Sequence, residues 1–239
     1  MNIAEIANTV IIECDSTNSL ARKLGETGFP HGTWVAARNQ SNGRGRHGRV
    51  WVSMEGNLFL SLVMRFKSRS ILTWVPLTAT VGVIKFLRCN YTRNSFKVKW
   101  PNDIVTTKGK IGGVLCEAFP NQLFVVIGIG LNCVSAPEMA SSLSVELGAE
   151  VTADDVRSGV IESVMSSFDE LISNGPSKIA VSYKDWCAIP SGSRIMWNYD
   201  CSGDVIGLGP SGELIVKNTN GNTVKLFAED IRAVRGAYA

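Results

Sequence analysis

The sequence of 239 residues has no paired cysteine motif and very little histidine. Its six cysteines are widely scattered, no two form a CxxC pair, and only His31 and His47 accompany them. Structural zinc sites need such ligands at close spacing, so we do not expect one here. Scattered cysteines are typical of reduced thiols in a cytosolic protein, and we predict a cytoplasmic location.

Long apolar runs and a secretion signal are also missing. The longest apolar stretches, around residues 72–87 and 123–129, are shorter than the roughly 18 to 20 residues that a membrane-spanning helix needs. Residues 1–11 contain no basic segment followed by an apolar run. We therefore expect neither a secretion signal nor membrane association.

Acidic residues are absent between Glu26 and Glu55, a stretch that holds Arg38, Arg44, Arg46 and Arg49. The whole chain has 24 Lys and Arg against 21 Asp and Glu, a net charge of +3, so the rest sums to 20 minus 21, or −1. The positive charge is therefore concentrated in one segment. A composition of 45% hydrophobic and 19% charged residues indicates a folded globular protein, long enough for a large and a small domain.

Local patterns predict an α+β protein. Apolar and β-branched runs predict strands over 9–14, 34–37, 57–64, 96–99, 110–117 and 122–128. Helices are predicted over 17–25, 72–87, from 153 to 174 behind an N-cap at Thr152, and over 177–186. After Pro190, five short β-rich runs (194–199, 203–207, 213–217, 223–227 and 231–234) predict a small SH3-like barrel. We expect a larger domain over 1–187 and the barrel over 188–239.

The loop over residues 40–51 alternates glycine with arginine. Its glycines at 43, 45 and 48 let the backbone approach a ligand closely, and its arginines offer forked donors to phosphate or carboxylate oxygens. Trp51 offers a flat face for an adenine ring. A solvated basic loop or an RGG-type nucleic-acid segment has a similar composition, although RGG segments repeat and this one occurs once.

Two further segments carry polar residues at predicted strand ends. Lys99-Trp100-Pro101-Asn102-Asp103 is followed by Lys110-Ile111-Gly112-Gly113, seven residues beyond Asp103. Asp103 is a candidate to bind a metal or orient an amine, and Lys110 is a candidate to neutralise an anion. An Asx turn and an exposed strand lysine are the simpler alternatives. Paired glycines in a strand favour close approach of a ligand or another backbone.

The remaining motifs are Gly128-Ile129-Gly130-Leu131-Asn132 and Asp15-Ser16-Thr17-Asn18. The first suggests a strand that passes beneath a ligand and leaves Asn132 to read a base edge; a tightly packed strand is the alternative. All four residues of the second are helix-capping types, and a plain N-cap also explains them.

In this order and spacing, the segments resemble the biotin protein ligases (biotin–[acetyl-CoA-carboxylase] ligases). The resemblance spans nearly the whole chain, and the GRGRxGR loop is highly specific in combination with KWPND. It implies a mixed β-sheet with flanking helices, of the class II synthetase-like type, followed by the small barrel. It also implies synthesis of biotinyl-5′-AMP and pyrophosphate from biotin and ATP, and then transfer of biotin to a lysine of a biotin carboxyl carrier domain.

The same resemblance assigns roles to individual residues. Biotin is expected to contact Ser16, Thr17, Gln40, Gly43, Arg44, Lys110, Gly113 and Gly128. ATP and the adenylate are expected to contact Arg44, Arg46, Arg49, Trp51, Asn102, Lys110 and Asn132. The expected catalytic residues are Lys110, Arg46 and Asp103, of which Asp103 orients or deprotonates the carrier lysine. Mg²⁺ is expected mainly through ATP, with Asp103 as a candidate ligand, and no structural metal is expected.

Repressor-type members of the family carry a DNA-binding helix-turn-helix domain before the ligase core. Only 14 residues precede Asp15 here, so we expect a ligase that does not bind DNA. An exposed sheet edge in this fold suits either a homodimer or the carrier, and both stay open.

Three alternatives remain beside this interpretation. A lipoate–protein ligase has the same fold, although the RRxxGGG loop of lipoate enzymes is absent. A non-catalytic nucleic-acid-binding protein would spread its positive charge over a face rather than concentrate it. A catalytically inactive scaffold would not be expected to retain Lys110, Arg46 and Asp103.

Overall fold

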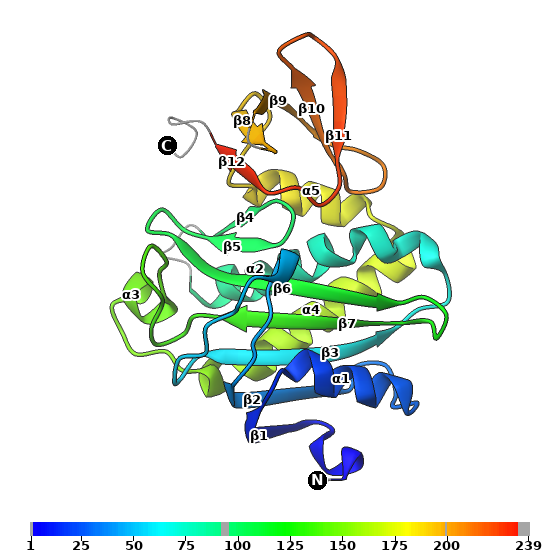
Figure 1. Ribbon diagram of the computed structural model, residues 1–239, viewed down its shortest axis with the longest axis vertical. Coiled ribbons are helices and arrows are strands. Elements are labelled where there is room, and N and C mark those ends of the chain that lie inside the picture. The colour runs from blue at the N-terminus through cyan, green and yellow to red at the C-terminus, as the bar shows by residue number, and fades with distance from the viewer. Residues whose placement is uncertain (1, 92–95, 199, 234–239) are drawn as a thin grey trace.

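A seven-stranded mixed sheet forms most of the larger domain in the computed structural model, which describes residues 2–91, 96–198 and 200–233 (Figure 1). Its strands lie in the order β1-β2-β3-β7-β6-β5-β4. β1 and β2 are parallel, and the other neighbours are antiparallel. The strands are β1 (Thr9–Cys14), β2 (Trp34–Gln40), β3 (Leu58–Arg65), β4 (Lys97–Lys99), β5 (Asp103–Val105), β6 (Lys110–Phe119) and β7 (Phe124–Leu131).

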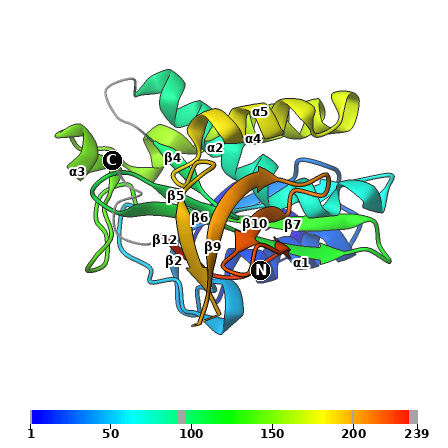
Figure 2. The ribbon, with the colours of Figure 1, turned by 90° about the horizontal axis from the view of Figure 1, so that it is seen from above.

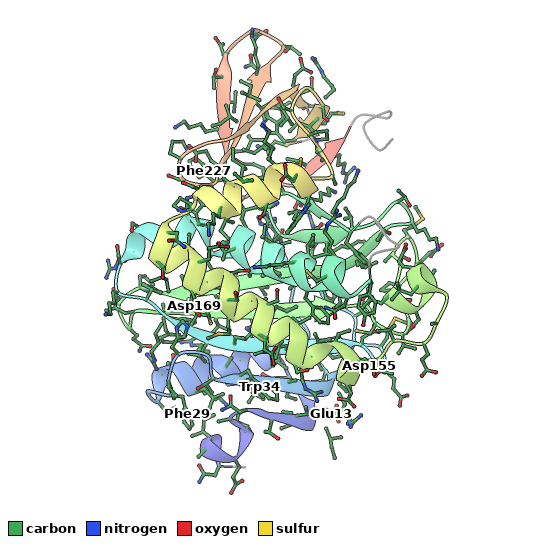
Figure 3. All side chains as sticks on the ribbon, turned by 180° about the vertical axis from the view of Figure 1, so that it is seen from behind. Glu13, Phe29, Trp34, Asp155, Asp169 and Phe227 are labelled. Atoms are coloured by element: carbon green, nitrogen blue, oxygen red, sulfur yellow. The ribbon has the colours of Figure 1, made fainter. Side chains whose placement is uncertain are left out.

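Helices cover both faces of this sheet (Figure 2). They are α1 (Thr17–Glu26), α2 (Val75–Asn90), α3 (Leu143–Leu147), α4 (Ala153–Asn174) and α5 (Ser177–Trp186), with short 3-10 turns η1 (Ile3–Ile6), η2 (Arg46–Gly48) and η3 (Arg69–Trp74). α2, α4 and α5 form a layer on one face, where Figure 3 shows α4 with Asp155 and Asp169 along it. α1 packs against β3 and β7 on the other face.

Small residues allow α2 and α4 to pack closely behind the sheet. A Cβ on Gly82 of α2 would lie 2.8 Å from the backbone of Val164, and a Cβ on Gly159 of α4 would lie 2.1 Å from the ring of Phe86. Contacts this short do not occur for real Cβ atoms, so a larger residue at either position would push the two helices apart.

The apolar helix α2 behind the sheet continues directly from the 3-10 turn η3. The helical stretch Arg69–Asn90 spans 22 residues, reaches a mean hydropathy of 1.5, and meets the length and composition criteria for crossing a membrane. However, 61% of its most apolar window is buried inside the protein. Its hydrophobicity is therefore that of a core helix.

The C-terminal part of the chain forms a five-stranded antiparallel sheet in the order β11-β10-β9-β8-β12, and this part corresponds to the small domain that the sequence predicts. Its strands are β8 (Arg194–Trp197), β9 (Cys201–Leu208), β10 (Leu214–Asn218), β11 (Thr223–Leu226) and β12 (Ile231–Ala233). No strand pairing joins β11 to β12 within the described residues. The antiparallel sheet is thus established, and its closure into an SH3-like barrel stays a prediction.

Two tryptophans of the larger domain fasten the small domain. Trp74 Nε1 donates a hydrogen bond to the carbonyl oxygen of Pro210 at 3.0 Å, and Trp100 Nε1 donates to that of Gly212 at 3.1 Å. One apolar core also runs from α2 and the large sheet to Ile195 and Val216 of the small sheet. The small domain is therefore held by both directional bonds and shared apolar burial.

The structure confirms the predicted strands and helices, with shifts at their ends. The predicted start of a helix at residue 72 is wrong, because residues 69–74 form a 3-10 turn and α2 begins at Val75, with Pro76 in its first turn. β8 ends at Trp197 because Asn198 has a φ of 46°, and the predicted strand residues Tyr199 and Val234 lie outside the described residues. The short elements β5 and α3 were not predicted.

The buried face of α4 gives a test of the core. Phe168 is 1% exposed, so Phe168→Ala should lower the free energy of unfolding by about 3 to 5 kcal/mol because it leaves a cavity. Ile172 lies one turn later and is 52% exposed, so Ile172→Ala should cost less than about 1 kcal/mol. Urea denaturation of both variants measures the difference, and equal losses would contradict the assigned packing.

Candidate active site

One cavity of about 410 Å³ lies between the large sheet, the arginine loop (residues 43–51) and strand β12 of the small domain. This volume is within the range of small-molecule sites. Its lining includes six cationic side chains and three acidic ones: Arg44, Arg46, Arg49, Lys99, Lys110 and Arg232, with Asp103, Glu229 and Asp230. The excess of three positive charges, six minus three, suits an anionic ligand.

Glycines bring the backbone of β7 to the floor of the cavity. A Cβ on Gly128 would lie 2.1 Å from Asn18 Oδ1, and a Cβ on Gly130 would lie 2.4 Å from the indole of Trp51. Both positions therefore require glycine. The side chain of Trp51 lies on Gly130, with Lys110 Nζ 5.4 Å from the centre of its ring system.

The indole N–H of Trp51 is buried and has no hydrogen-bond partner among the described residues. Buried donors in folded proteins are normally paired, because an unmade hydrogen bond costs free energy. Trp51 itself lines the cavity, so a small movement of its indole would let a ligand acceptor satisfy this donor.

The start of α1 forms a polar end of the cavity. Ser16 is the N-cap residue, but its hydroxyl makes no capping hydrogen bond. Instead, Gln40 Oε1 accepts from the Thr17 backbone N–H at 2.9 Å and lies 3.1 Å from Thr17 Oγ1. The plain N-cap considered for this motif is thus replaced by a side chain from β2, which leaves the Ser16 hydroxyl uncommitted to the helix.

Cations with incomplete compensation gather at the other end. Lys110 Nζ lies 2.7 Å from Asp103 Oδ1, and Arg46 Nη1 donates to Asn102 Oδ1 at 2.8 Å. Burial lowers the pKa of Arg46, although Asp103 opposes the shift. Burial also lowers the pKa of Lys99, again against the pull of Asp103. A bound anion would stabilise both charged side chains.

The arginine loop reaches across to the small domain. Arg49 forms an ion pair with Asp230, and Arg46 donates to the carbonyl oxygen of Ala228. His47 Nε2 lies 3.1 Å from the same carbonyl oxygen. The loop is therefore held over the cavity by contacts that phosphate oxygens would be able to replace.

The structure brings most of the predicted site residues into this one cavity. Twelve line it: Ser16, Thr17, Gln40, Arg44, Arg46, Arg49, Trp51, Asn102, Asp103, Lys110, Gly113 and Gly128. Gly43 and Asn132 are not in its lining. Asn132 is 4% exposed, and its Nδ2 donates to the carbonyl oxygens of Lys110 and Ser141, so it holds the segment after β7 against β6.

The sequence motifs gave no role to several polar residues of the cavity and its rim. Asn18 ends the Asp15-Ser16-Thr17-Asn18 motif and Lys99 begins the Lys99–Asp103 motif, so their positions in the sequence could have identified them as site residues. Glu117, which pairs with Arg44, and Arg232, from the small domain, have no such signal. Their placement depends on strand register and on the docking of the two domains.

Comparison with known protein families gives one clear match. The sequence profile of the biotin/lipoate A/B protein ligase family matches residues 10–133. The matched segment contains the start of α1, the arginine loop, the Lys99–Asp103 segment and the glycines of β7. The match therefore covers about half of the chain and nearly all of the cavity's large-domain side.

Individual relatives extend this likeness over most of the chain. The bifunctional ligase/repressor BirA of Bacillus subtilis is 30% identical over 239 aligned residues, which cover 90% of this chain and 70% of that protein. The biotin–[acetyl-CoA-carboxylase] ligase of Mycobacterium tuberculosis is 30% identical over 244 aligned residues, covering 95% and 88%. The structure of the biotin protein ligase from Aquifex aeolicus in complex with biotin and ATP superposes with a TM-score of 0.81 at 24% identity, covering 95% and 98%, and supports the fold.

The environment of Cys14, which directly precedes the start of the α1 motif, predicts a thiol of low reactivity. Burial, with Asp15 and Glu13 adding to it, raises the pKa of the Cys14 thiol to about 11, so only about a thousandth of it is thiolate at pH 8. We expect iodoacetamide at pH 8 to alkylate the exposed Cys89 and Cys201 well before Cys14. Peptide mass mapping over time measures the order. Early labelling of Cys14 would contradict this environment.

Proposed function

The chain belongs to the biotin/lipoate A/B protein ligase family, and from this premise we propose that it is an ATP-dependent biotin–protein ligase. It joins biotin to ATP, giving biotinyl-5′-AMP and pyrophosphate, and then transfers the biotinyl group to a lysine of a biotin carboxyl carrier domain. One observation carries the proposal: a single cavity joins a polar end, a glycine floor and a cluster of cations.

The polar end suits the ureido ring of biotin. That ring presents two N–H donors and one carbonyl acceptor, and Ser16, Thr17 and Gln40 offer hydroxyl and amide partners. The dithiolane ring of lipoate offers no comparable hydrogen-bonding groups. A lipoyl ligand would therefore leave this polar end unpaired, and sites built for hydrogen bonding reject such analogues strongly. This end favours the biotin enzyme over the lipoate alternative.

The glycine floor suits the chain that links the biotin ring to its carboxylate. Gly113 and Gly128 line the cavity between its polar and cationic ends. The apolar chain of biotin lies against the backbone at Gly113, passes Asn18 beside Gly128, and reaches Lys110. Lys110 then faces the biotin carboxylate and the α-phosphate.

Trp51 suits the adenine ring of ATP. Trp51 lines the cavity and offers an aromatic face, and an acceptor on the nucleotide satisfies its buried N–H once the indole moves. A contact from Asn132 to adenine remains part of the proposal, although it requires the Asn132 amide to exchange its hydrogen bond with Ser141.

The cations address the main barrier of the first step. A carboxylate that attacks a triphosphate is an anion approaching a polyanion, so the reaction needs positive charge that screens the approach and stabilises the departing pyrophosphate. Lys110, Arg46 and Arg49 supply this charge, and Asn102 orients Arg46 through its 2.8 Å hydrogen bond.

Mg²⁺ fits the cavity as a companion of the nucleotide. Within the described residues, no group of three or more His, Cys, Asp or Glu side chains is placed to hold a metal. Phosphate oxygens would supply most of the ligands, with Asp103 as the candidate carboxylate. When bound, the ion neutralises charge on the triphosphate.

Asp103 has a separate role in the second step. An ammonium group has no lone pair with which to attack, so the carrier lysine must lose a proton. The Asp103 carboxylate is part exposed and lies 2.7 Å from Lys110, beside the position proposed for the mixed anhydride. It orients the incoming amine and accepts its proton, while the arginine loop keeps water from the anhydride.

Finer features of the molecule belong to the same proposal. We assign residues 1–187 to the catalytic domain and residues 188–239 to an SH3-like barrel.

β1 lies at an edge of the large sheet and exposes Ile12 by 81%, which leaves it accessible to a second subunit or to the carrier.

One assay tests the proposal directly. The protein is incubated with ATP, Mg²⁺, a biotin carboxyl carrier domain and either biotin or lipoate, and the carrier is weighed by mass spectrometry. We expect a single biotinyl adduct and no lipoyl adduct. A lipoyl adduct alone would support the lipoate–protein ligase. An unmodified carrier in both reactions would refute the ligase proposal.

The role of Lys110 is tested in the first step alone. Lys110→Gln should lower the rate of biotin-dependent exchange between ATP and radiolabelled pyrophosphate by about 100-fold or more, because the substitution removes the positive charge that stabilises the reacting anions. Lys108→Gln is the matched control: Lys108 lies just before β6, and its Nζ contacts the Val145 carbonyl oxygen outside the cavity. Normal exchange by the Lys110 variant would refute its role.

A further inference from the structure

Arg44 and Arg49 of the arginine loop are both paired with a carboxylate, but only the partner of Arg44 lies on the large sheet. Arg44 Nη2 contacts both carboxylate oxygens of Glu117 on β6, at 3.1 and 3.2 Å. Arg46, by contrast, is bonded to the neutral amide oxygen of Asn102 and to a backbone carbonyl. A phosphate can replace neutral partners of an arginine more easily than it can replace a carboxylate.

Glu117 is held in place from its other side. Asn18 Nδ2 donates to Glu117 Oε2 at 2.6 Å. Asn18 is only 4% exposed, its Oδ1 accepts from Ser61 Oγ at 2.6 Å, and its amide packs against the backbone at Gly128. The position of the Glu117 carboxylate is therefore fixed by a buried amide, whether or not Arg44 is present.

This fixed carboxylate makes Arg44 a poor anion ligand. A phosphate or biotin carboxylate that captured the Arg44 guanidinium would leave Glu117 unpaired, with two negative groups close together. Glu117 is unable to swing away without breaking its bond to the buried Asn18. Keeping the Arg44–Glu117 ion pair, which connects the arginine loop to β6, is therefore more favourable than binding an anionic ligand with Arg44.

The same contacts lead back to the polar end of the cavity. Ser61 Oγ, which donates to Asn18, also lies 2.8 Å from Thr17 Oγ1. The hydroxyl proton of Thr17 then serves the contact with Ser61, and the backbone N–H of Thr17 donates to Gln40 Oε1 at 2.9 Å. Continuous hydrogen bonds thus join the proposed ring-binding residues to the beginning of the arginine loop.

We propose that Glu117 is a positioning residue, and that Arg44 acts through it as the anchor of the arginine loop rather than as a ligand of the α-phosphate. This inference rests on the proposed ligase function and revises the role that the family resemblance implies for Arg44. The anchor keeps the first turn of the loop against β6, so that Arg46 and Arg49 face the adenylate.

A double-mutant cycle tests the anchor through the rate at which the protein releases biotinyl-5′-AMP. Glu117→Gln and Arg44→Gln should each raise the release rate about tenfold, the scale of one lost charge-assisted contact. The double variant should also be raised about tenfold and not a hundredfold, because both changes remove the same interaction. Arg44→Lys, which keeps the charge, should recover part of the loss.

The opposite role predicts the opposite sign. If Arg44 binds phosphate, Glu117 competes with the ligand, so Glu117→Gln would slow release or leave it unchanged, and the two effects would add. Either result would overturn the inference. Glu13→Gln on β1, at the edge of the same sheet, is the matched control, because among the described residues Glu13 accepts only a long 3.4 Å bond from Asn39 and lies outside the cavity.

Two further measurements separate positioning from general damage. The thermal midpoint of the Glu117 variant should equal that of the wild type, and its transfer rate from bound adenylate to the carrier should be unchanged. A lowered midpoint with a matching loss in every step would indicate a structural role and overturn the inference. Failure of the wild type to form biotinyl-5′-AMP would instead contradict the proposed function itself.

Discussion

Mutual repulsion between like charges governs the design of this cavity. Six cationic side chains face one space, and without compensation their burial would destabilise the fold. These side chains have partners of different kinds: a carboxylate held by a buried amide for Arg44, a more exposed carboxylate for Arg49, and neutral oxygens for Arg46. These partners sort the cations into those that hold the loop and those that remain able to accept an anionic ligand.

The second constraint is that side chains from α1 and the arginine loop must pack directly against the backbone of β7. Glycines on that strand make this possible. Gly128 and Gly130 on β7 admit Asn18 and Trp51 against the sheet, so recognition groups from α1 and the arginine loop converge on the same strand. The core behind this strand is rigid, because α2 and α4 pack tightly against the far face. A closely packed sheet suits a site that must hold a reactive intermediate in one geometry.

Local sequence patterns predicted most of the elements, because apolar periodicity, capping residues and glycine turns act over a few residues. They missed β5 and α3, which have only three and five residues and are formed by tertiary pairing. At the site, the motifs predicted twelve of the cavity's lining residues. They did not predict Glu117, whose role depends on the register of β6, or Arg232, whose position depends on domain docking. They also gave no reason to place Asn132 away from the cavity, since its burial follows from the fold of the segment after β7.

The contact between the arginine loop and Ala228 has a consequence for how the protein folds. Arg46 and Ala228 are 182 residues apart in the sequence. Contacts of such high sequence separation carry a large loop-closure cost and form late during folding. The large sheet and its helices depend on nearer neighbours and can assemble first. The contact between the arginine loop and the small domain is therefore expected to be among the last to form on refolding. Recovery of native secondary structure should precede recovery of a complete site.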